Sequence, residues 1–97
     1  MLVIAHHFVQ DANAFWAAAK NAMETSAIPQ SLVLHSVFPS TDGQTGTCVW
    51  EAESAGEVQE WLDNTFGDSA KNVTYQVDEK EAYGLPKKSA AAASLSL

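Results

Sequence analysis

Three histidines and one cysteine are the side chains of this sequence best suited to acid–base, metal or thiol chemistry: His6, His7, His35 and Cys48. Histidine titrates near neutral pH and can act as a general acid or base. Histidine and cysteine are also good ligands for zinc, nickel and copper, and a histidine beside a cysteine favours a reactive thiolate. Which of these chemistries the chain supports depends on the elements that position the four residues.

Two of the histidines are adjacent in the stretch LVIAHHFV, Leu2–Val9, whose apolar, β-rich composition is typical of a buried strand. Neighbouring side chains of a strand point to opposite faces of the sheet. His6 and His7 are therefore expected in different surroundings. One of them should face the core, and the other should face whatever covers the second side of the sheet.

Helical and strand patterns alternate along the rest of the chain. Apolar residues at helical spacing follow the candidate cap Asp11 and predict a helix over 12–23. A capping-box pattern with Ser54 as cap predicts a second helix, which should end near Gly67. Three further strands are predicted at residues 31–38, 47–52 and 72–77.

The resulting order, β-α-β-β-α-β, predicts an α+β fold of the ferredoxin-like type. Four antiparallel strands would form one sheet, and both helices would cover one of its faces. We assign residues 1–86 to this single domain, because 97 residues leave no room for a second core. Residues 87–97 (KKSAAAASLSL) are low in complexity and are interpreted as a C-terminal tail.

The charge balance excludes several classes of partner. The formal net charge is −7 and the chain has no arginine, which disfavours binding to nucleic acid and to anionic membrane surfaces. A single cysteine cannot form an intramolecular disulfide. The N-terminus lacks the pattern of a signal peptide, and no apolar run is long enough to span a membrane, so a cytoplasmic location is expected.

Both faces of the predicted sheet are apolar, although helices can cover only one of them. The first strand places Leu2, Ile4, His6 and Phe8 on one side and Val3, Ala5, His7 and Val9 on the other. A free monomer would expose an unusually large apolar patch. Because two-fold homodimers are the commonest oligomers, the pattern predicts a homodimer that packs through the sheet face, or closes into a shared barrel.

The same pattern predicts a mainly apolar cavity that binds a small, largely apolar molecule, either between sheet and partner or between sheet and helices. Its histidine would be His6, whereas His7 and His35 would face the helix layer with satisfied hydrogen bonds. A one-residue register error would exchange these faces. The candidate ligand-binding residues are His6, Phe8, Leu34, Ser36, Cys48 and Trp50.

Residues 1–86 resemble the dimeric α+β-barrel superfamily of ferredoxin-like domains. The nearest likeness is to small, uncharacterised bacterial members with a histidine late in the first strand, here His6, and one in the second strand, here His35. The stretch 48–54 (CVWEAES) is similar to their Cys-x-x-Glu-Ala pattern. His7 departs from the family, in which a basic residue is expected after the first histidine.

The resemblance implies a homodimer but leaves the activity open, since relatives include cofactor-independent monooxygenases, polyketide cyclases, haem-degrading enzymes and ligand binders. One alternative is therefore a cofactor-independent oxygenase or isomerase with His6 as the catalytic acid or base. Another is a divalent-metal-binding protein with His6, His35 and Cys48 as ligands, although no Cys-x-x-Cys or His-x-x-x-His spacing supports it. Cys48 is either a nucleophile beside His6 or, preferably, a small buried hydrophobe.

Overall fold

The computed structural model describes residues 1–25 and 27–85, so the predicted tail lies outside the described residues. The predicted β-α-β-β-α-β order is confirmed. The elements are β1 (Leu2–Val9), α1 (Ala12–Glu24), β2 (Val33–Pro39), β3 (Thr45–Glu51), α2 (Ala55–Phe66), the 3-10 helix η1 (Gly67–Ser69) and β4 (Ala70–Gln76).

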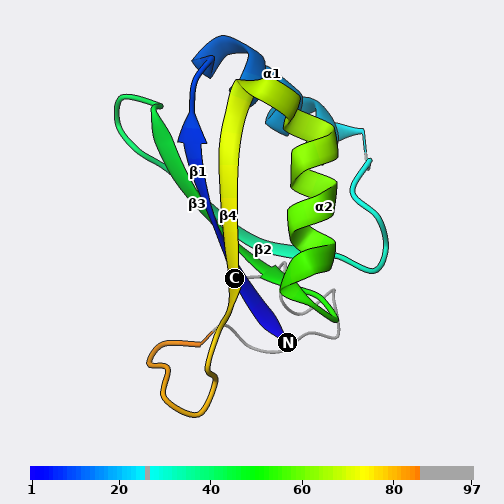
Figure 1. Cartoon of the computed structure of the whole chain (residues 1–97), viewed down its shortest axis with the longest axis vertical. Helices are drawn as coiled ribbons and strands as arrows, with labels where there is room; N and C mark the ends of the chain where they lie inside the picture. The colour runs from blue at the N-terminus through cyan, green and yellow to red at the C-terminus, as the bar shows by residue number, and fades with distance from the viewer. Residues whose placement is uncertain (26, 86–97) are drawn as a thin grey trace.

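The four strands form one sheet in the order β2-β3-β1-β4, with every neighbouring pair antiparallel. β1 and β3 are central, and β2 and β4 are the edges, which is the ferredoxin-like arrangement predicted from the sequence. Both helices lie on one side of this sheet (Figure 1). Among the described residues no helix covers the opposite side, which we call the open face.

The helix boundaries follow from capping side chains. An Asp11 carboxylate oxygen accepts a hydrogen bond from the Ala14 amide at 3.1 Å and begins α1. The Ser54 hydroxyl oxygen accepts one from the Glu57 amide at 3.1 Å and begins α2. Gly67 ends α2 with a φ of +51°, a conformation that residues with a Cβ rarely adopt.

The first strand has the predicted bounds, and the boundaries of the other three differ from the predicted ones by one or two residues. β2 begins at Val33 because the Leu32 amide donates to the Pro29 carbonyl at 3.0 Å and closes a turn before the strand. Pro39, expected to stop this strand, is its last residue, which is tolerated because β2 is an edge strand.

The hydrophobic core fills the space between the sheet and the two helices. Aromatic rings are its largest members, with Phe15 and Phe66 4.5 Å apart and Trp50 and Trp61 5.6 Å apart between ring centroids. Trp16 ties α1 to the β2–β3 hairpin, because its Nε1 donates to the Gly43 carbonyl at 2.8 Å. The buried core residues are Val3, Ala5, Phe15, Leu32, Cys48, Trp50, Ala52, Val58, Leu62, Phe66 and Ala70.

The register of the sheet corrects part of the predicted face assignment. Ala5 lies opposite Cys48 and Val3 lies opposite Trp50, so these β3 side chains share the helix-covered face with His7. His6 lies opposite Thr47 and points to the open face. The prediction that Cys48 and Trp50 share a face with His6 is therefore wrong, because strand pairing, which the sequence pattern did not specify, decides which residues lie opposite one another.

A β-bulge in β2 produces the second correction. Leu34 pairs with Trp50, but the next paired residue is Ser36, which lies opposite Val49. The extra residue, His35, shifts the alternation of the strand. Leu34 consequently faces the helices, and Ser36 faces the open side, although the sequence pattern placed them on the same face.

Candidate functional site

A small cavity lies between the sheet and the helices. Its volume is about 30 Å³. This is enough for at least one water molecule, which needs roughly 10–15 Å³, but is well below the roughly 150 Å³ of an engineered cavity that admits benzene. The lining residues are His7, Phe15, Trp16, Ala19, Ala22, Met23, Ile28, Leu34, Val37, Cys48, Trp50, Trp61, Leu62 and Phe66.

The structure divides the predicted ligand-binding residues into two groups. Leu34, Cys48 and Trp50 line the cavity. His6, Phe8 and Ser36 do not, because they belong to the open face. The histidine of the cavity is therefore His7, which the sequence pattern correctly placed toward the helices with a satisfied hydrogen bond.

His7 is held by hydrogen bonds at both ring nitrogens. Its side chain is buried, with 1% of the residue exposed. The Nδ1 atom lies 2.7 Å from the Asn72 side-chain oxygen, and the Nε2 atom lies 3.1 Å from the Cys48 sulfur. Asn72 faces the helices from β4, directly opposite His7 in the register. Three neighbouring strands thus bring one residue each to this site.

The hydrogen bonds continue from the buried site to helix α2. The Asn72 amide nitrogen donates to an Asp63 carboxylate oxygen at 3.1 Å. The Gln59 side-chain amide donates to both Asp63 oxygens at 3.1 Å, and to the Asn72 carbonyl at 2.7 Å. This chain of contacts, from Cys48 through His7 and Asn72 to Asp63, is called the polar chain below.

The acceptor at one end of the polar chain, the Asp63 carboxylate, fixes the protons along its length. An ionised carboxylate can only accept, so Asp63 requires the Asn72 amide nitrogen to face it. The Asn72 oxygen then faces His7 and must accept from Nδ1–H. In the neutral imidazole this leaves Nε2 as the acceptor, and the Cys48 thiol as its donor. The structure thereby selects one tautomer of His7, with an Nε2 lone pair directed at Cys48.

Burial keeps this pair uncharged. Desolvation lowers the pKa of His7, and the nearby His6 lowers it further, while the hydrogen bond to Asn72 acts in the opposite direction. Burial raises the pKa of the Cys48 thiol to about 12. The resting state is a neutral thiol beside a neutral imidazole, and not a thiolate–imidazolium pair. This disfavours Cys48 as a nucleophile and supports its interpretation as a buried, weakly polar side chain.

The indole nitrogen of Trp50 is the second polar feature of the cavity wall. Trp50 is 2% exposed, and among the described residues its Nε1 atom is buried without a hydrogen-bond partner. Trp16, by contrast, donates to a backbone carbonyl. Buried polar atoms without partners are rare, because each costs about 1–3 kcal/mol.

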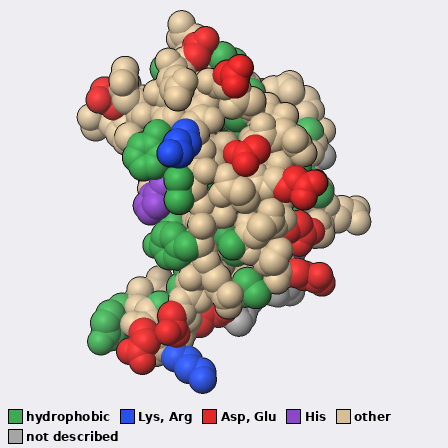
Figure 2. Space-filling view, in the orientation of Figure 1, with side chains coloured by type: hydrophobic (Ala, Val, Ile, Leu, Met, Phe, Trp, Pro, Cys, Tyr) green, Lys and Arg blue, Asp and Glu red, His purple; other side chains and the backbone are tan. Residues whose placement is uncertain are grey.

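The open face carries most of the exposed hydrophobic residues within the sheet. Phe8, Phe38, Val73 and Tyr75 are 51%, 61%, 41% and 49% exposed. His6 lies among them, 3.1 Å from the Thr47 hydroxyl oxygen and with its ring 6.0 Å from that of Tyr75. Figure 2 shows hydrophobic side chains on either side of a histidine along the left edge of the view.

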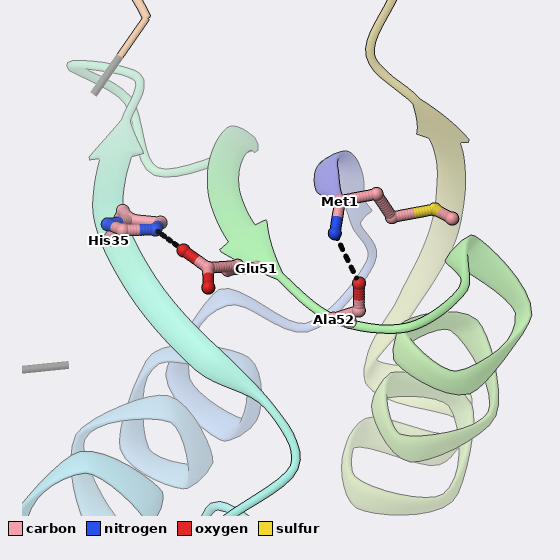
Figure 3. A network of polar contacts seen from close by, with 4 residues as sticks. All are labelled: Met1, His35, Glu51 and Ala52. Atoms are coloured by element: carbon pink, nitrogen blue, oxygen red, sulfur yellow. Dashed lines mark hydrogen bonds and ion pairs between the residues drawn. The ribbon is translucent and has the colours of Figure 1, made fainter. Parts of the chain in front are cut away.

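His35 belongs to neither the cavity nor the helix layer, which corrects its predicted position. Its Nε2 atom lies 3.2 Å from a Glu51 carboxylate oxygen, and the two side chains point toward one another from β2 and β3 (Figure 3). Glu51 pairs with Leu2 and Val33, on the side of the sheet opposite Trp50. The bulge at His35 explains the change of direction.

The alternative metal site is not assembled within a single copy of the chain. Cys48 lies on the helix-covered face, whereas His6 lies on the open face, so these residues cannot bind one ion with His35. In the part of the chain that the structure describes, no three histidine, cysteine or acidic side chains form a group suited to a metal ion. Within the same residues, no helix has the length and apolarity needed to cross a membrane.

Comparison with protein-family models, curated proteins and solved structures finds no match to this chain. The structure shows a βαββαβ fold with a four-stranded antiparallel sheet. This fold by itself does not determine the function.

Sequence reasoning did not find the polar chain. His7 and Asn72 are 65 positions apart, and no motif links them. One signal was present. Polar and apolar residues alternate in the predicted fourth strand, and Asn72 belongs to one of its two faces. An asparagine on the buried face of a strand requires buried partners, but the sequence alone did not show which face that was.

Proposed function

We propose that the protein is a homodimeric small-molecule-binding domain of the dimeric α+β-barrel type, and that each protomer binds a small, largely apolar ligand between its sheet and its helices. The observation that supports this best is the composition of the cavity wall. Aromatic and aliphatic side chains make up most of it, and among the described residues its polar side chains are His7, Cys48 and the tryptophans. Apolar walls with a few polar groups are typical of ligand pockets.

The mouth of the cavity lies near the end of α1. Met23 lines the cavity and is also 46% exposed, so this side chain separates the interior from solvent. Methionine is flexible and adapts to irregular contacts. Because the space is small, the ligand contains only a few heavy atoms, or enters as Met23 and the neighbouring Ile28 rearrange.

The second copy of the chain would cover the open face. Three of its four exposed hydrophobic residues lie in β1 and β4, and the fourth, Phe38, lies in β2. They therefore extend across the sheet. A two-fold axis through this face would place the apolar rows of two sheets against each other, which removes the same exposed patch from both copies.

Titration of the ¹⁵N-labelled protein with isobutene, a hydrocarbon small enough for this space, tests ligand binding when followed by NMR. We expect saturable shifts of amide signals from residues around the cavity. Ala19 lines the cavity on α1, and Ala19→Leu should fill the space and abolish these shifts. Ala17→Leu is the matched control, because Ala17 is exposed on the same helix. Equal binding to both variants, or no binding to the unmodified protein, would contradict the proposal.

An enzymatic role is the second candidate, favoured by the tautomer of His7. The Nε2 lone pair of the neutral imidazole lies at the wall of an apolar cavity, and it could accept a proton from a bound substrate that displaces the Cys48 thiol from it. The base of a cofactor-independent isomerase or oxygenase would then be His7, and not His6 as the sequence pattern indicated. Turnover that is lost in His7→Gln but retained in His6→Gln would support this alternative.

A further inference from the structure

We propose that the ligand of the cavity carries one uncharged hydrogen-bond acceptor, such as a ketone or ether oxygen, which accepts from the Trp50 indole N–H. This inference rests on the proposed function, because it specifies the chemistry of the ligand at the same cavity. It goes beyond a general apolar ligand by naming the polar group that the wall requires and the atom that recognises it.

The environment of Trp50 provides no such acceptor from the described residues. Its Nε1 atom is buried and has no hydrogen-bond partner. The Trp61 ring packs edge-on with 5.6 Å between centroids and an interplanar angle of 63°, but an aromatic face is only a weak acceptor. Indole N–H groups usually find a partner when they are buried. Trp50 lines the cavity, and we infer that a molecule bound there supplies the acceptor.

The other strongly polar groups of the cavity wall already satisfy one another. His7 uses Nδ1 with Asn72 and Nε2 with Cys48, and the Cys48 thiol donates to that same Nε2 atom. A ligand that hydrogen-bonded to His7 would have to displace the thiol. Trp50 therefore offers a donor with no competing contact, and recognition at this end of the cavity favours an acceptor over a donor.

The charge of the wall selects a neutral acceptor. No lysine of the described residues lines the cavity, and His7 is held neutral by burial. A carboxylate or phosphate entering this space would lose its hydration without meeting a cation. A carbonyl or ether oxygen loses much less hydration free energy on transfer from water. One hydrogen bond from Trp50 would replace its hydrogen bond to water. The apolar remainder of the ligand would contact the aliphatic and aromatic wall.

A matched pair of probes tests the inference. Acetone and isobutene have nearly the same shape and few heavy atoms, as the small cavity requires, but only the ketone has an acceptor. We would titrate the ¹⁵N-labelled full chain with each and follow the three indole N–H signals, assigned with Trp16→Phe, Trp50→Phe and Trp61→Phe. The ketone should shift the Trp50 signal downfield and bind at least about tenfold more tightly than the hydrocarbon, since it satisfies a buried donor.

Two variants separate the hydrogen bond from the shape of the pocket. Trp50→Phe keeps an aromatic ring and removes the donor, so both probes should bind this variant with equal affinity. Trp61→Phe alters another tryptophan of the same wall and should retain the preference for the ketone. Should Trp50→Phe fail to fold, the indole shift and the affinity ratio in the unmodified protein decide the matter alone.

The outcomes distinguish this inference from the proposed function. Equal binding of both probes, with an unshifted Trp50 signal, would overturn the acceptor inference and leave the apolar cavity intact; the partner of Trp50 would then be water. Failure of both probes to bind would contradict the proposed function as well. Preference for the ketone in Trp50→Phe would also overturn the inference, because the acceptor would then bind elsewhere.

Discussion

The His7 Nε2 atom and the Cys48 sulfur lie 3.1 Å apart on the buried side of the sheet, whereas His6, the adjacent residue, points to the opposite side and contacts Thr47. The alternation of a single strand thus separates two histidines into different chemical environments. His7 belongs to the polar chain beside an apolar cavity, with both ring nitrogens hydrogen-bonded. His6 lies among exposed hydrophobic residues on the open face.

Cys48 should react slowly with thiol reagents in the folded protein. Its pKa of about 12, against an ordinary value of 9.0, lowers the thiolate fraction at neutral pH about a thousandfold, because each unit is a factor of ten. We expect colour development with a disulfide reagent to be at least about a hundredfold slower in buffer than in 6 M guanidinium chloride. A native rate equal to the denatured rate would show that the thiol is accessible and ionised.

Asn72→Ala should destabilise the protein by about 1–3 kcal/mol, because it leaves the buried Nδ1–H of His7 without an acceptor. Urea denaturation followed by tryptophan fluorescence measures this change. Asn64→Ala is the control, since Asn64 is exposed on α2 and its replacement should change the free energy of unfolding by less than about 0.5 kcal/mol. Equal effects of the two substitutions would show that the polar chain contributes nothing specific.

The stability should fall as the pH decreases from about 7 to 5. The pKa of His7 is lowered in the folded state, so the unfolded state binds more protons once the pH drops below the ordinary value of 6.5. The stabilisation is complete above that value and declines toward the folded pKa, by up to about 1.4 kcal/mol per pH unit. His7→Gln should reduce this slope, whereas His6→Gln should retain the contribution of His7. An unchanged slope in His7→Gln would contradict the assignment.

Phe8→Lys should weaken the proposed dimer. Phe8 is half exposed on the central strand β1 and lies opposite Lys71, so an ammonium there would be buried against the second copy beside a like charge. We expect the dissociation constant from sedimentation equilibrium to rise at least about a hundredfold, as burial of an uncompensated charge costs several kcal/mol. Ala17→Lys on the exposed side of α1 should leave it unchanged. Equal dissociation constants for the two variants would exclude the open face as the interface.

Much of the fold could be predicted from the sequence because its signals are local. Asp11, Ser54 and Gly67 mark helix ends through their own side chains or backbone, and the structure confirms each of them. The alternation of Leu2–Val9 correctly separated His6 from His7. These features depend on neighbours within a few residues, so no knowledge of strand pairing was needed.

The composition of the site could not be predicted in the same way, because it depends on register. Whether Cys48 faces His6 or His7 is decided by which residues of β1 and β3 lie opposite one another. The bulge after Leu34 adds one residue to β2 and reverses the expected direction of the positions before it. The partnership of His7 with Asn72 joins strands that are distant in sequence. A single sequence does not encode these pairings in any local pattern.

Native mass spectrometry of the purified full chain tests the central claim most directly, since it reports copy number and bound mass together. We predict an ion of two copies that carries a small neutral organic mass on the unmodified protein and on Ala17→Leu, and that loses this mass, but not the second copy, in Ala19→Leu. A bare monomer at every protein concentration would contradict both the dimer and the ligand-binding proposal. A dimer whose bound mass survives Ala19→Leu would place the ligand outside the cavity.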